Sequence, residues 1–211
     1  MVHISERRDP DGRYGLSVQR RGGGEPHLGD LWLWVDSPMG GGDGDTLAAA
    51  AILAYGHVMG RQFRAPEGMS PSLAQALHEV REGRQVQPIK VVGNESPPAR
   101  GPNVLVLAEQ GEPCSHRSMA EYRLELLDGD QYIGHQLSRE AVRIPSSSRF
   151  FAHMTECPSP WLADLACALL VSERLDVGTV VLDADVSDHT FWVGDRVLAA
   201  AGYRLERSVK P

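Results

Sequence analysis

The stretch SPWLADLACALLVSERLDVGTVVLDADVSDHTFWVGDRVLAAAGYRLE, residues 159–206, alternates two apolar helix patterns with two short strand patterns. Ser159 and Pro160 mark the start of the first helix, because a polar cap followed by proline is typical of a helix N-terminus. The expected elements are, in order, a helix at 160–174, a strand at 179–182, a helix at 189–201 and a strand at 203–206. Such close alternation favours crossover connections on a parallel sheet.

The preceding part of the chain continues the alternation of strands and helices. Its expected elements are a strand at 31–35, helices at 46–58 and 71–82, and strands at 89–92 and 104–108. Residues 31–35, Leu-Trp-Leu-Trp-Val, are apolar without a break, which favours a central strand covered on both faces. We therefore expect an α/β fold in which helices cover both faces of a mainly parallel sheet.

An antiparallel hairpin is expected in the middle of the chain, at an edge of the sheet or in an insertion. Polar and apolar residues alternate strictly from Glu121 to Leu126, which is typical of a half-exposed strand. The following Asp-Gly-Asp is a turn signal, and residues 131–137 supply the partner strand.

The pattern predicts one main domain. Residues 1–30 form a polar lead-in with one short strand at 14–18, and residues 31–211 form a single α/β domain. A candidate boundary between two lobes lies near 145–149, where a proline and three serines are typical of a loop.

Composition excludes several classes of protein. The chain has 211 residues, is 42% hydrophobic and carries a formal net charge of -7, and this acidity argues against broad nucleic-acid binding. No apolar stretch reaches the roughly 18 to 20 residues that a membrane helix needs, so no membrane partner is expected. From the charged start we expect no secretory signal, and three cysteines cannot close a disulfide framework. Both features favour a bacterial-type cytoplasm.

Two segments concentrate the negative charge. Five acidic residues lie between Arg21 and Arg61, and another five lie between Arg174 and Arg196. Neither segment contains a lysine or an arginine. Each segment surrounds the end of a predicted buried strand, where ligands usually bind in open α/β sheets. The simplest explanation for both segments is a solvated acidic face.

A magnesium site is the alternative explanation for these acids. Its candidate ligands are the carboxylates of Asp36, Asp43, Asp45, Asp183 and Asp185, since Mg²⁺ prefers oxygen ligands. His189 is then a candidate general acid or base. The alternative requires the strand that ends at residue 35 to neighbour the strand that ends at residue 182, because adjacent strands lie about 4.8 Å apart.

The loop at 38–45, Pro-Met-Gly-Gly-Gly-Asp-Gly-Asp, joins a predicted strand to a predicted helix. The backbone amides of Gly40, Gly41, Gly42 and Gly44 are candidates to hold an anion at the helix N-terminus. The loop lacks the Gly-Lys-Ser/Thr ending of a phosphate-binding P-loop. A tight, capped turn is the competing explanation.

Four sulfur and imidazole groups are nominal zinc ligands: Cys114, His116, His153 and Cys157. Thiolates and imidazoles are the usual ligands of structural zinc, but these four do not have the spacing of a zinc finger. Unrelated loop residues are the simpler explanation, and the sequence leaves the question open.

Trp32 and Trp34 share one face of the strand at 31–35, because side chains two apart in a strand point the same way. Two indoles on one face are most simply core residues. If this strand is exposed, they instead form an interaction surface, because aromatic residues are enriched at binding hot spots.

Two functions follow from these observations. The favoured one is a non-catalytic accessory or partner-binding protein whose partner is another protein. It is favoured because the candidate motifs of the chain, such as the glycine-rich loop, differ from the established catalytic patterns at essential positions. The alternative is a Mg²⁺-dependent hydrolase or transferase that acts on a phosphate-containing substrate at the acids that end the parallel strands.

Overall fold

The computed structural model describes residues 2–20, 31–37, 40–81, 86–93, 99–108, 121–129, 136–137 and 141–208. None of the helices in these ranges has the length and apolar character needed to cross a membrane.

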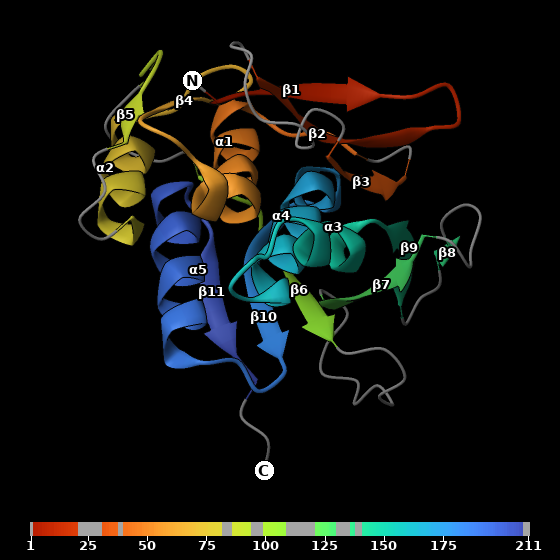
Figure 1. The fold of residues 1–211 in the computed structure, drawn as a ribbon. Coiled ribbons are helices and arrows are strands. Elements are labelled where there is room, and N and C mark those ends of the chain that lie inside the picture. Colours follow the sequence, from red (N-terminus) through yellow and green to blue (C-terminus); the bar gives the residue numbers. More distant parts are fainter. Residues whose placement is uncertain are drawn as a thin grey trace.

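A mixed sheet organises the molecule (Figure 1). Its strands are β1 (Val2–Arg8), β2 (Arg13–Arg20), β3 (Trp32–Asp36), β4 (Gln62–Arg64), β5 (Gln87–Pro88), β6 (Asn103–Ala108), β7 (Glu121–Asp128), β8 (Gln136–Leu137), β9 (Val142–Ser146), β10 (Val177–Asp183) and β11 (Arg204–Arg207). The strand order is β11-β10-β6-β7-β9-β3-β2-β1-β4-β5, and β8 pairs with β9. The strands from β11 to β9 run parallel, whereas β1, β2 and β3 form an antiparallel meander. The expected α/β fold with a mostly parallel sheet is confirmed, and the sheet contains an antiparallel hairpin, which lies among β1 to β3 and not in the middle of the chain.

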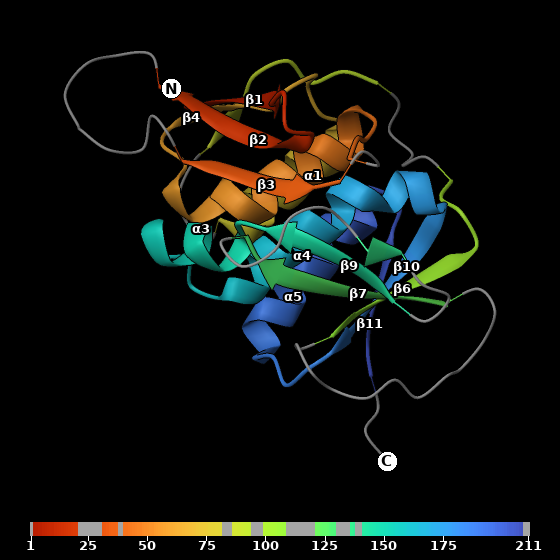
Figure 2. The ribbon, with the colours of Figure 1, turned by 90° about the vertical axis from the view of Figure 1, so that its right-hand side faces the viewer.

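The helices pack against this sheet. They are α1 (Gly44–Tyr55), α2 (Pro71–Val80), α3 (Ser148–Met154), α4 (Pro160–Ser172) and α5 (Asp188–Ala200), with short 3₁₀ turns at Gly56–Val58 and Glu173–Leu175. α1 is buried from Thr46 to Tyr55 and packs on the equally apolar α4. In Figures 1 and 2 the meander lies above α1, and the parallel strands lie on the other side of the two buried helices.

The N-terminal region contains two strands, which corrects the expectation of one. Residues 2–8 pair with residues 14–20 along their whole length, and the core side chains include Ile4 and Leu16. The turn between them places Gly12 at φ +94°, a backbone conformation that glycine adopts without strain. The charged run Glu-Arg-Arg at the end of β1 obscures the alternation of apolar and polar residues that precedes it.

β3 is an interior strand, but it is not covered on both faces as expected. Leu33 and Val35 are fully buried, whereas Trp32 and Trp34 are partly exposed. The alternation is hidden in the sequence because the outward positions carry indoles, which are themselves apolar.

β7 is parallel to both of its neighbours, β6 and β9, so the hairpin expected at 121–137 is wrong in its first strand. Its polar residues Arg123 and Glu125 are buried, and Glu125 accepts a hydrogen bond from Arg143 at 2.8 Å. Residues 131–135 of the expected partner strand lie outside the described residues. The boundary suggested at 145–149 falls where β9 leads into α3, and the three serines there are buried.

Candidate functional site

Asp43, one of the candidate magnesium ligands, caps α1. Its Oδ1 accepts the amide of Thr46 at 2.7 Å, and its two carboxylate oxygens accept bonds of 2.8 and 3.2 Å from the guanidinium of Arg100. Burial alone would raise the pKa of Asp43, but the hydrogen bonds from Arg100 and Thr46 outweigh it and hold the pKa below its ordinary value. The carboxylate of Asp43 therefore has a structural role, because it caps α1 and pairs with Arg100.

Asp45 is likewise tied to a neighbouring element. Its Oδ1 accepts the backbone amide of Ser70 at 2.9 Å, and Ser70 is the N-cap of α2. The two acids of the glycine-rich loop therefore bind separate backbone and guanidinium donors, instead of facing a common point.

The remaining candidate ligands follow strands that do not adjoin. Asp36 ends β3 and Asp183 ends β10, with Asp185 two residues later, yet β6, β7 and β9 lie between β3 and β10. The condition set by the magnesium alternative is therefore not met. Within the described ranges, no three His, Cys, Asp or Glu side chains gather closely enough to hold a metal ion.

Backbone amides of the glycine-rich loop donate hydrogen bonds to carbonyl groups of the protein. Gly40 donates to the carbonyl of Ser37 at 3.1 Å, and Gly41 donates to the carbonyl of Leu170 at 2.9 Å. Gly42 lies against the side chain of Thr46, and Gly44 is the first residue of α1. Two of the four candidate amides are thus already paired, as in a tight turn between strand and helix.

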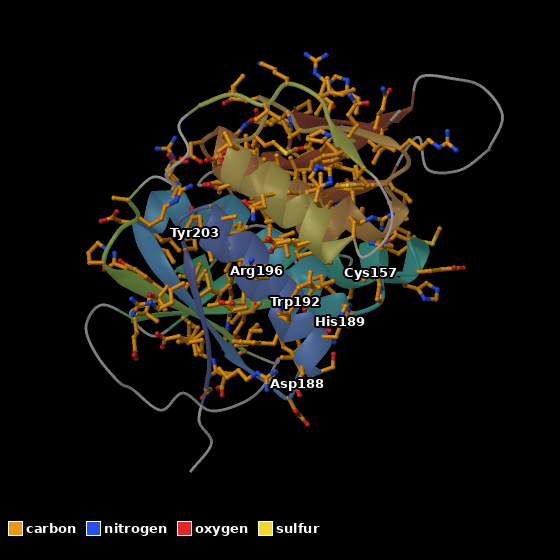
Figure 3. All side chains as sticks on the ribbon, turned by 90° about the vertical axis from the view of Figure 1, so that its left-hand side faces the viewer. Cys157, Asp188, His189, Trp192, Arg196 and Tyr203 are labelled. Carbon is orange, nitrogen blue, oxygen red and sulfur yellow. The ribbon has the colours of Figure 1, made fainter. Side chains whose placement is uncertain are left out.

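His189 lies in the first turn of α5, and this helix is not adjacent in sequence to the glycine-rich loop. Its ring stacks on Trp192 with centroids 6.1 Å apart, and Figure 3 shows both side chains along α5.

His153 is an exposed residue of α3, and the thiol of Cys157 donates to the carbonyl of Ser159 at 3.2 Å. Burial raises the pKa of Cys157. Cys114 and His116 lie outside the described residues.

The indoles of β3 are brought together with basic side chains on the outer face of the meander. Residues paired across neighbouring strands point to the same side of a sheet. The pairs Ser5–Ser17, Ser17–Trp32 and Arg13–Asp36 in the register therefore share this face. The tryptophan face consists of His3, Ser5, Arg7, Arg13, Ser17, Trp32, Trp34, Asp36 and Arg64.

An arginine side chain stacks on each indole ring of the tryptophan face. The Cζ of Arg7 lies 4.4 Å from the ring centroid of Trp32, and the Cζ of Arg13 lies 4.5 Å from that of Trp34. The two indoles are 6.2 Å apart and inclined at 47°. Stacking of this kind is attractive and fixes the orientation of an arginine, so its N–H groups are presented in a defined place.

The strand beneath the indoles is held firmly. The Oγ of Ser147 accepts the amide of Trp34 at 2.9 Å and donates to the carbonyl of Trp32 at 3.0 Å. Gly129 packs against the Trp34 ring so closely that a Cβ there would lie 2.3 Å from it. The indoles therefore stand on a rigid support.

Two donors on the tryptophan face have no acceptor among the described residues. The indole Nε1 of Trp32 and the Nε of Arg13 are shielded from solvent and make no hydrogen bond there. An unpaired, shielded donor costs about 1 to 3 kcal/mol and calls for an explanation.

Sequence reasoning found the indoles but missed the arginines. Arg7 and Arg13 belong to β1 and β2, and only the register of the meander places them over Trp32 and Trp34. The available signal was the alternation of Val2 and Ile4 with polar residues, which predicts a strand with one outward face.

No protein-family model matches the chain, and comparisons with curated proteins and with solved structures also give no match.

Proposed function

We propose that this protein is a non-catalytic, partner-binding protein that engages another macromolecule through the tryptophan face. The observation that carries the proposal is the outward position of Trp32 and Trp34 on an interior strand, each beneath an arginine. Tryptophan and arginine are among the residue types enriched at binding hot spots. Partly exposed indoles on a rigid sheet lose little conformational freedom on binding, which favours affinity.

The enzyme alternative has weaker support. Asp43 and Asp45 bind donors of the protein itself, and the strands that precede Asp36 and Asp183 are not neighbours. A shared cation needs converging carboxylates, so the geometry favours binding over catalysis.

Photo-crosslinking in the native cells tests the proposal. A photoreactive amino acid replaces Ser17, at the centre of the tryptophan face, and in a matched control it replaces the exposed Gln75 of α2. We expect discrete adducts from position 17 that are absent from position 75. Near-ultraviolet circular dichroism verifies that both variants are folded. If both positions give the same adducts, or position 17 gives none, the proposal is wrong.

A further inference from the structure

We infer that the tryptophan face binds an extended acidic segment of a partner protein, with carboxylates at alternate positions contacting Arg7 and Arg13. This inference rests on the proposed function and adds the chemistry of the partner. Three observations carry it: the charge of the face, its unpaired donors, and the spacing of its two stacked arginines.

The tryptophan face is basic within an acidic chain. Its charged or titratable members are His3, Arg7, Arg13, Arg64 and a single acid, Asp36, whereas the chain as a whole has a formal charge of -7. Among the described members of the face, three arginines and a histidine thus stand against one carboxylate, which is the cross-strand neighbour of Arg13. A surface with this sign selects a partner of the opposite sign.

The hydrogen-bonding groups of the face are mainly donors. Guanidinium groups only donate, and so does an indole N–H. The Nε of Arg13 and the Nε1 of Trp32 have no acceptor among the described residues. A ligand rich in acceptor oxygens pairs with these donors once it displaces the side chains that cover them, whereas a basic or apolar ligand leaves them unpaired.

The two stacked arginines are spaced for an extended chain. Arg7 is paired with Gly15, and Arg13 lies two residues away from Gly15 on β2, so the arginines are diagonal neighbours. Diagonal neighbours lie about 7 to 8 Å apart, and their Cβ atoms are somewhat closer. Alternate residues of an extended peptide lie about 6.6 to 6.8 Å apart, so carboxylates at positions i and i+2 reach both guanidinium groups.

The observations favour an acidic protein segment over a nucleic acid. Nucleic-acid affinity grows with the number of phosphates neutralised, and this face offers few cations. The acidic segment between Arg174 and Arg196 lies outside this face and repels a long polyanion, whereas a short acidic motif contacts only the face itself.

Fluorescence anisotropy with a labelled peptide that alternates glutamate with serine tests the inference on the whole chain. The comparison probes are a peptide of the same composition with its glutamates in one block, a peptide that alternates lysine with serine, and single-stranded oligothymidylate. The variant is Arg7→Gln with Arg13→Gln. The control is Arg174→Gln with Arg204→Gln, which removes the same charge from exposed positions outside the tryptophan face.

We expect the alternating glutamate peptide to bind most tightly, and the Arg7 and Arg13 double variant to bind it about tenfold more weakly, with no loss in the control. Equal binding of the blocked peptide, tighter binding of oligothymidylate, or equal loss in both double variants would each overturn the inference. If no probe binds while position 17 still gives adducts in cells, the acidic partner is wrong and the proposed function stands. Circular dichroism shows whether the double variants are folded.

Discussion

At the scale of single residues, Asp164 of α4 is a carboxylate placed in the core. It is 7% exposed, and its Oδ1 has no hydrogen-bond donor among the described residues. Burial raises the pKa of Asp164 to about 6, although its hydrogen bond with Ser148 and the nearby charge of Arg149 act in the opposite direction. The nearby carboxylate of Asp128 adds to the increase.

This raised pKa predicts a stability that depends on pH. The folded state holds the proton of Asp164 more tightly than the unfolded state, whose pKa is near 3.8. The stabilisation is complete below pH 3.8 and is lost as the pH rises to about 6. We expect Asp164→Asn, which stays neutral, to gain about 2 to 3 kcal/mol in free energy of unfolding relative to wild type between pH 4 and pH 7.

Urea unfolding of both proteins at pH 4 and pH 7 measures this gain. Asp185→Asn, which removes a carboxylate from an exposed position, is the control, and its stability at pH 7 should equal that of wild type. A constant difference between Asp164→Asn and wild type at the two pH values would contradict the assignment.

At the scale of elements, the start of α1 depends on one ion pair. Arg100 is 8% exposed, stacks over Tyr203 at 4.4 Å, and donates to the carbonyl of Ala201 as well as to Asp43. The pair therefore joins the N-terminus of α1 to the end of α5. Breaking it leaves a shielded guanidinium without its counter-ion.

We expect Asp43→Ala to lower the free energy of unfolding by about 2 to 4 kcal/mol, because it removes both the cap and the partner of Arg100. Asp43→Asn keeps an oxygen that can accept the amide of Thr46, so its loss should be smaller. Chemical unfolding of both variants at neutral pH checks the order. Equal stability of the alanine variant and wild type would show that the pair is dispensable.

Elements with local signals could be predicted from the sequence. Ser70 and Pro71 predict the start of α2, and the structure confirms it, because Ser70 caps the helix by accepting the amide of Leu73 at 3.3 Å. β7 could not be assigned correctly, because its buried Glu125 is paired with Arg143, a residue of the neighbouring strand β9. A polar residue in a strand predicts exposure only when no distant partner is present.

At the scale of the whole molecule, the order of the strands decides what the candidate residues can do. The sequence identified the acids at the ends of β3 and β10 but could not show that three strands separate them. It identified Trp32 and Trp34 but not the guanidinium groups above them, since those come from β1 and β2. Spatial order is set by long-range pairing, which no local pattern records.

The central claim is that the tryptophan face is the binding surface, and ¹⁹F NMR of protein labelled with 5-fluorotryptophan tests it most directly. The chain has four tryptophans, so Trp161 and the 37% exposed Trp192 serve as internal controls. On addition of native cell extract, we predict that the signals of Trp32 and Trp34 shift or broaden while those of Trp161 and Trp192 stay unchanged. A change confined to Trp192, or no change at Trp32 and Trp34, would contradict the claim.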